Sequence, residues 1–80
     1  TLEKIGQVRK AERYLKNLGH KIVRVRNWDG LAVIEVDPDR IERLTDPKGR
    51  QELLSTFQGL GFKVVALDLE GYKSGKMNRF

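Results

Sequence analysis

The sequence predicts a small α+β domain, a two-layer sandwich in which a three-stranded antiparallel sheet carries two main helices on one face. Three observations predict this fold. Residues 2–18 have apolar positions at helical spacing, residues 21–36 hold two alternating segments around an Asp-Gly pair, and residues 47–69 again place a helical pattern before a strand pattern. The predicted element order is therefore α-β-β-α-β, and a chain of 80 residues has room for one modest core.

The first helix is predicted over residues 2–18, because apolar side chains recur there every three or four positions with polar residues between them. These apolar positions are Ile5, Val8, Ala11, Leu15 and Leu18. Gly19 comes directly afterwards, where a glycine commonly ends a helix. The helix is therefore amphipathic and is expected to bury one face against the sheet.

Residues 21–26 and 31–36 are predicted to form a β-hairpin. Asp29-Gly30 lies between them, and this pair favours a type I′ turn, in which both central residues need a positive φ. The turn sets a register with four facing pairs: Val23 with Val36, Arg24 with Glu35, Val25 with Ile34, and Arg26 with Val33. The core-forming valines and the isoleucine then share one face, while the arginines and the glutamate share the other. A slip of one residue would turn the valines to the wrong side.

Two Asp-Pro pairs predict helix starts, because proline is favoured at the first helical position. Asp37-Pro38 is expected to cap and open a short helix, and Asp46-Pro47 a longer one that Gly61 closes. The following residues, 62–69, form a predicted strand with apolar side chains on both faces, a pattern typical of interior strands. We place the first strand in the middle of an antiparallel sheet, with strand order 2-1-3.

Residues 1–70 are predicted to form the single domain, and residues 71–80 an extended or flexible tail. Because both main helices are expected on the face that carries the valines, nothing in this chain should cover the opposite face. The side chains expected there are Ile22, Arg24, Arg26, Leu31, Val33 and Glu35. A basic and apolar sheet face of this kind is either wet or covered by a partner.

Arg24 and Arg26 are two residues apart on one strand, so their guanidinium groups leave the same face about 6.5–7 Å apart at the backbone. Two planar, permanently charged groups at this spacing can clamp a phosphate or sulfate, and Glu35 across the strand can orient one of them or hold a cation. The alternative is a cross-strand Arg–Glu pair worth at most about 1 kcal/mol beside a solubilising arginine.

Trp28 at the hairpin tip is unusual for a solvated loop. It can stack on a ligand or dock on a partner, because an indole combines a large apolar surface with a polar N–H group. A packed cap on the hairpin is an equally good interpretation.

Composition excludes several classes of protein. The chain has no Cys and a single His, which excludes disulfides, Cys-based zinc sites and His-rich metal sites. No apolar run approaches the roughly 18–20 residues that a membrane span requires. No nucleophile–base pair, Rossmann glycine motif or metal-ligand cluster is present, so no residue is predicted to be catalytic. We therefore expect a binding or accessory domain and not a complete enzyme.

The formal net charge of +5 is unevenly distributed. Residues 1–26 carry eight basic and two acidic side chains, whereas residues 27–46 carry six acidic and two basic ones. A basic face suits an anionic partner such as a nucleotide, a nucleic acid or phosphate, and the plainer alternative is solvated helix charge. A small RNA-binding module is a second hypothesis, against which the chain lacks the interleaved aromatic residues that stack on bases. An oligomerisation domain without catalysis is a third.

Two segments resemble a known family. They are residues 24–36, in which RVR precedes LAVIEV, and residues 67–78, LDLEGYKSGKMN. Together with two helix–Leu-Gly–strand units, they make nearly the whole chain similar to the C-terminal domain of the PP-loop ATP pyrophosphatase family, in particular its LarE-type ATP-dependent sacrificial sulfur transferases. Val33 stands where that family often has Arg, and the turn at residues 27–30 differs from the family's His- and Gly-containing turn.

The resemblance implies a role within a larger cytoplasmic enzyme. In this family an N-terminal PP-loop domain binds ATP with Mg²⁺ and adenylates a substrate carboxylate, and the C-terminal domain completes the active site. In LarE-type members the substrate is a nicotinic-acid-derived mononucleotide, and sulfur transfer makes a precursor of the nickel-pincer nucleotide cofactor. This chain has no PP-loop, so ATP and Mg²⁺ would bind through the other domain.

The resemblance also implies roles for individual residues. Arg24 and Arg26 match the family's phosphate- and substrate-contacting arginines, and Glu35 matches its acidic partner, which orients them or holds a cation. The implied partners are the PP-loop domain of the same protein and the phosphorylated mononucleotide, and a homo-oligomer remains an alternative.

Overall fold

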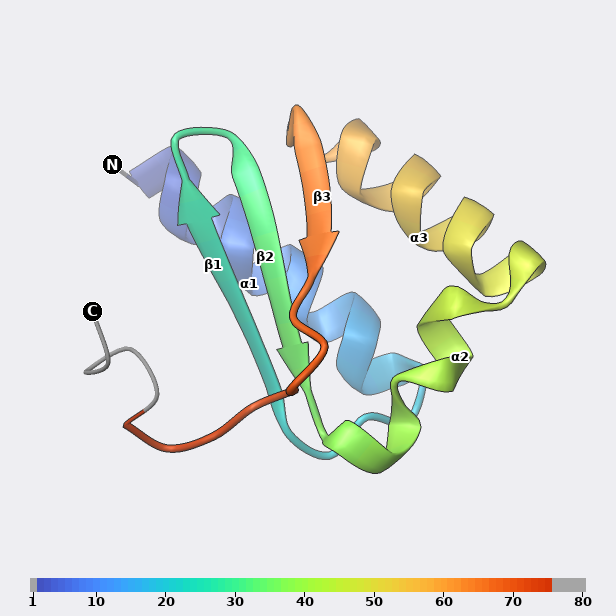
Figure 1. Ribbon diagram of the computed structural model, residues 1–80. Helices are drawn as coiled ribbons and strands as arrows, with labels where there is room; N and C mark the ends of the chain where they lie inside the picture. The colour runs from blue at the N-terminus through green and yellow to red at the C-terminus, as the bar shows by residue number, and fades with distance from the viewer. Residues whose placement is uncertain (1, 76–80) are drawn as a thin grey trace.

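The computed structural model describes residues 2–75, so Thr1 and the last five residues of the predicted tail lie outside the described part of the chain. The elements of this part follow the predicted order α-β-β-α-β (Figure 1). They are α1 (Leu2–Asn17), β1 (Val23–Trp28), β2 (Leu31–Val36), the 3₁₀ helix η1 (Pro38–Arg40), α2 (Glu42–Thr45), α3 (Pro47–Gly59) and β3 (Val64–Leu67). The short helix expected after Asp37 is thus divided into η1 and α2.

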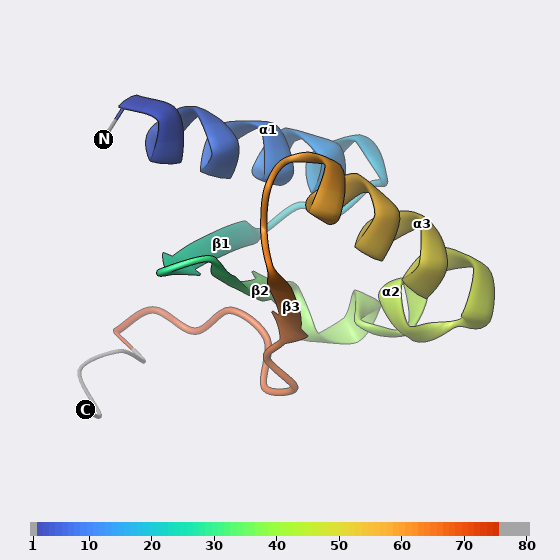
Figure 2. The same ribbon diagram turned by 90° about the horizontal axis from the view of Figure 1, so that it is seen from above.

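The structure has two layers, as predicted. Both α1 and α3 lie on one face of the sheet, and the segment that follows β3 passes on the other side (Figure 2). None of the helices within residues 2–75 combines the length and the apolar character that crossing a membrane requires. The α+β class and the placement of both main helices on one face are confirmed.

The predicted strand order and the purely antiparallel sheet are wrong. The strands lie in the order β1-β2-β3, and β2 runs antiparallel to β1 but parallel to β3. The reason is the connection between β2 and β3, because a helical crossover carries the chain back to its starting end and the next strand runs parallel. The central strand is therefore β2. The strand predicted at residues 62–69 is a short edge strand, in which Val64 is 58% exposed.

The predicted hairpin and its register are confirmed. Val25 lies opposite Ile34 and Arg24 opposite Glu35. Both turn residues have positive φ, 53° for Asp29 and 96° for Gly30, as a type I′ turn requires. The turn is held further by Asn27, whose side-chain oxygen accepts from the Gly30 N–H at 2.9 Å.

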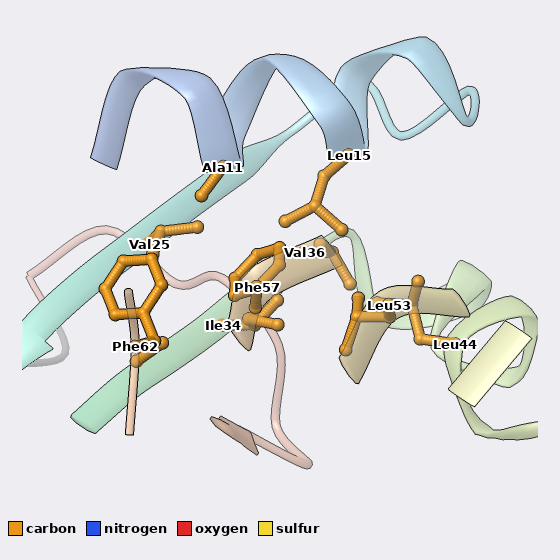
Figure 3. Close-up of a cluster of buried hydrophobic side chains, with 10 residues drawn as sticks. Ala11, Leu15, Val25, Ile34, Val36, Leu44, Leu53, Phe57 and Phe62 are labelled. Atoms are coloured by element: carbon orange, nitrogen blue, oxygen red, sulfur yellow. The ribbon is translucent and has the colours of Figure 1, made fainter. Parts of the chain in front are cut away.

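The core lies between the helices and the sheet, with Phe57 of α3 at its centre (Figure 3). Phe57 is 0% exposed, and its ring centroid lies 5.5 Å from that of Phe62 and 6.3 Å from that of Tyr14. Leu15 of α1 and Ile34 of β2 are also fully buried. One aromatic cluster therefore joins α1, α3 and the start of β3 to the central strand.

The two Asp-Pro pairs behave differently. Asp46 caps α3 as predicted, because its Oδ1 accepts from the Gly49 N–H at 2.7 Å. The predicted cap at Asp37 is wrong, since this side chain makes no capping hydrogen bond. Its carboxylate instead lies 3.3 Å from Nδ1 of His20, a residue only 2% exposed, and 3.4 Å from Nε of Arg40. The Asp37 carboxylate thus contacts the buried imidazole of His20 and does not cap η1.

We expect Phe57→Ala to lower the free energy of unfolding by about 3–5 kcal/mol, because the change removes the ring that fills the centre of the core. Urea denaturation followed by far-UV circular dichroism measures this loss. The matched control is Leu69→Ala, which removes a side chain that is 80% exposed and should change stability by less than about 0.5 kcal/mol. Equal losses for the two variants would contradict this placement of the core.

Two glycine-to-alanine changes should have opposite effects on the free energy of unfolding. Gly6 lies inside α1 with open space where a Cβ would stand, so Gly6→Ala should stabilise by about 0.5–1 kcal/mol. Gly30 has a φ of 96° in the turn, so Gly30→Ala should destabilise by about 1 kcal/mol or more. The same denaturation experiment compares them, and a neutral Gly30→Ala would argue against the type I′ turn.

Candidate functional site

The side of the sheet away from α1 and α3 carries the residues that the sequence predicts to bind an anion. Because side chains alternate along a strand, Arg24 and Arg26 of β1 and Glu35 of β2 all leave the sheet on this side. Arg24 is exposed, and 36% of the Arg26 side chain is exposed. The register therefore brings the three predicted residues together on one face.

Glu35 pairs with Arg26 and not with the arginine directly across from it. Its Oε1 lies 3.6 Å from Nη2 of Arg26, along the diagonal of the hairpin. Within residues 2–75, Arg24 has no ion-pair or hydrogen-bond partner for its guanidinium group. Glu35 can thus orient Arg26, and the guanidinium group of Arg24 is available to contact a ligand.

The Arg26–Glu35 pair has unused hydrogen-bonding capacity. The distance of 3.6 Å exceeds the roughly 2.7–2.9 Å of a good charge-assisted hydrogen bond. Nε of Arg26 and Oε1 of Glu35 are both buried and have no hydrogen-bond partner among residues 2–75, and Glu35 as a whole is only 1% exposed. A buried polar group without a partner typically costs about 1–3 kcal/mol. Because the Arg26 Nε is buried, an anion could accept from its N–H and remove part of that cost only after the side chain shifts.

The expectation that nothing in this chain covers this face is wrong at the end of β2. After β3 the chain stays against β2, where the Tyr72 N–H donates to the Val36 carbonyl at 2.8 Å. Gly71 is buried there, and a Cβ on it would stand only 2.6 Å from that carbonyl oxygen. Figure 2 shows this segment on the side of the sheet away from α1. The sequence interpretation treated residues 71–80 as a separate tail and so did not place them here.

A cationic groove of about 400 Å³ runs along the outer edge of β1, between that strand and α1. Its basic lining residues are Lys4, Arg9, Arg24 and Arg26. Apolar side chains of α1 also line it, among them Val8. Basic groups from a helix and a strand thus surround one concave surface, which favours an anionic ligand over a neutral one.

Glu12 is a residue of this groove that the sequence interpretation missed. Its Oε2 accepts from the backbone N–H of Val25 at 3.0 Å, which satisfies a donor on the exposed edge of β1. The sequence does set this residue apart, because Glu12 is the single acidic residue between Lys4 and Arg26. Its carboxylate fixes α1 against β1 and adds one negative charge to a positive groove.

Trp28 ends β1 on the same face as the arginines, two residues beyond Arg26. It is 57% exposed, and its cross-strand partner is Leu31. A packed hairpin cap would bury more of the indole, so the structure leaves this ring available. Its contact with a ligand or partner stays a prediction.

The remaining titratable residues do not form a metal site in the described part of the chain. Between Leu2 and Gly75, no three His, Asp or Glu side chains gather closely enough to hold a metal ion. Glu35 would supply one carboxylate to a cation on the open face. His20 lies in the interior with Asp37, where its contacts are structural.

Comparison with known proteins places this chain beside segments of larger ones. No family model matches it. It is 49% identical over 79 residues to an uncharacterised protein of Synechocystis, which covers 99% of the chain and 30% of that protein. It is 43% identical over 81 residues to the pyridinium-3,5-bisthiocarboxylic acid mononucleotide synthase of Lactiplantibacillus plantarum, which covers 98% of the chain and 28% of the synthase.

A third relative is an uncharacterised protein of Methanocaldococcus jannaschii, which is 31% identical over 74 residues. The chain spans less than a third of the length of each of these relatives. Its similarity to the synthase nevertheless runs through α1, the hairpin and β3 without leaving out an element. The chain is therefore homologous to a segment of this LarE synthase, which is a larger protein.

Proposed function

We propose that this chain is a substrate-binding accessory segment, the C-terminal domain of a LarE-type ATP-dependent sulfur transferase. The observation that carries the proposal is the 43% identity to the pyridinium-3,5-bisthiocarboxylic acid mononucleotide synthase along 98% of the chain. The ligand proposed for this segment is accordingly a pyridinium mononucleotide, and Arg24 and Arg26 bind its phosphate.

The geometry of the open face supports this role. Arg24 has a guanidinium group without a partner in residues 2–75, and Arg26 has a buried Nε–H that donates to nothing. Both line the cationic groove beside α1. A phosphate has enough acceptor oxygens to take hydrogen bonds from both arginines at once. Glu35 already pairs with Arg26 before a ligand binds. The Arg26 side chain therefore loses less conformational entropy on binding.

The remaining parts of the reaction belong to other segments in this proposal. ATP and Mg²⁺ bind to an N-terminal PP-loop domain, where the substrate carboxylate is adenylated before sulfur transfer in the cytoplasm. The residues of this chain do not fit an ATP site of that type, because its sequence holds no PP-loop motif. The segment therefore orients the substrate and supplies no catalytic residue.

Nuclear magnetic resonance of the chain tests the phosphate site, because it detects binding as weak as the millimolar range. Inorganic phosphate and nicotinic acid mononucleotide, added at constant ionic strength, should both shift the side-chain Nε–H signals of Arg24 and Arg26. Arg24→Gln and Arg26→Gln should each weaken mononucleotide binding about 10- to 100-fold, the loss expected for a charge-assisted hydrogen bond.

The matched control is Arg50→Gln, which removes the same charge from α3 on the other side of the sheet. It should change the affinity less than about twofold. If Arg50→Gln weakens binding as much as the other two variants, the attraction is a property of net charge and the site is wrong. Signal changes confined to the helices would count against it equally.

A further inference from the structure

The side chains on the open face differ in polarity along the strands. The register of the strands places these side chains in rows that run across the sheet. Nearest the turn, Trp28 faces Leu31, and Leu31 faces Val64 of β3. The next row holds Arg26, Val33 and Ala66, and the row after that pairs Arg24 with Glu35. The face is therefore apolar at the turn and charged two residues further along.

The apolar row is open to solvent. Trp28 is 57% exposed and Val64 is 58% exposed, while Leu31 between them is half-buried. The described chain after β3 approaches the sheet at Val36, at the opposite end of β2 from this row. Trp28 has no aromatic partner among residues 2–75. An exposed indole at the end of a row with two aliphatic side chains is a flat surface that can bind a planar ring.

We propose that Trp28 binds the pyridinium ring of the mononucleotide whose phosphate Arg24 and Arg26 hold. This inference rests on the proposed function and adds the orientation of the ligand on the sheet. The phosphate lies over the arginine rows, the ribose over Val33, and the ring over Trp28 with Leu31 at its edge. Successive rows on one face are about 6.5–7 Å apart, which a ribose can bridge.

The charges of face and ligand agree with this orientation. The ligand is negative at its phosphate and positive at its ring nitrogen, and its ring also carries carboxylate groups that offset this positive charge. The arginines attract the first, and the electron-rich face of an indole attracts the second, because tryptophan is the best aromatic partner for a cation. The reverse orientation would place the ring carboxylates against Arg24 and Arg26, which attract them less strongly than a phosphate with its roughly two negative charges. The indole in turn favours a ring with a cationic nitrogen over a ring without one.

Fluorescence tests this contact directly, since Trp28 is the single tryptophan of the chain. Nicotinic acid mononucleotide should quench the indole along a saturable curve with the same midpoint as the arginine shifts. A collisional encounter would give a linear dependence instead, as free N-acetyltryptophanamide shows under the same conditions. Ribose 5-phosphate, which has the sugar and phosphate but no ring, should shift the arginine signals without quenching.

Variants of Trp28 distinguish ring stacking from an apolar contact that any large side chain could make. Trp28→Leu should weaken binding of nicotinic acid mononucleotide at least about fivefold, the loss typical of one stacked base, and leave ribose 5-phosphate unchanged. Trp28→Phe should restore most of the affinity because it keeps an aromatic face. Uridine monophosphate, whose ring has no cationic nitrogen, should bind more weakly to the unaltered chain than nicotinic acid mononucleotide does.

The outcomes that overturn this inference differ from those that overturn the proposed function. Equal affinities for ribose 5-phosphate and nicotinic acid mononucleotide, with no saturable quenching, would remove the role of Trp28 and leave the phosphate site standing. Absence of arginine shifts with every phosphate ligand would remove both. Tryptophan emission that changes with protein concentration, together with a dimer in sedimentation, would make this row a contact between two copies and would also overturn the inference.

Discussion

The two faces of the sheet depend on one constraint, the hairpin register that the turn at Asp29-Gly30 sets. Side chains alternate along a strand, so the register that buries Val25 against the helices also sends Arg24 and Arg26 to the opposite side. A slip by one residue would move the arginines under α1 and expose the apolar side chains to water. The stability of the core and the composition of the open face are therefore set by the same pairing.

The open face contains polar groups that lower the stability of the folded chain and that can contact a ligand. Glu35 is almost completely buried, yet its Oε1 and the Nε of Arg26 have no hydrogen-bond partners in the described part of the chain. Native proteins leave few buried polar groups without a partner, and those that remain call for an explanation. A ligand that accepts a hydrogen bond from Arg26 supplies one. The incomplete pairing at this point is one of the observations on which the proposed phosphate site rests.

Local sequence signals predicted the parts of this fold that local physics determines. The helical spacing of α1, the turn residues and the Asp46 cap all act over a few neighbouring residues, and the structure agrees with each of them. The parallel pairing of β2 and β3 was missed because it follows from a crossover of some thirty residues and not from the composition of either strand. Glu12 was missed for the same reason, since its partner Val25 lies thirteen positions away along the chain.

The proposed accessory role is consistent with the physics of arginines that are exposed to water. Interactions between a phosphate and guanidinium groups on an open surface are weak, because water screens the charges and competes for their hydrogen bonds. The same groups interact several times more strongly once a second surface excludes water, since the effective dielectric constant falls. This chain covers one side of its sheet with its own helices and leaves the arginine rows and Trp28 on the other. In the proposed function this face selects and orients the ligand, and a second surface from the larger protein would exclude water and strengthen the binding.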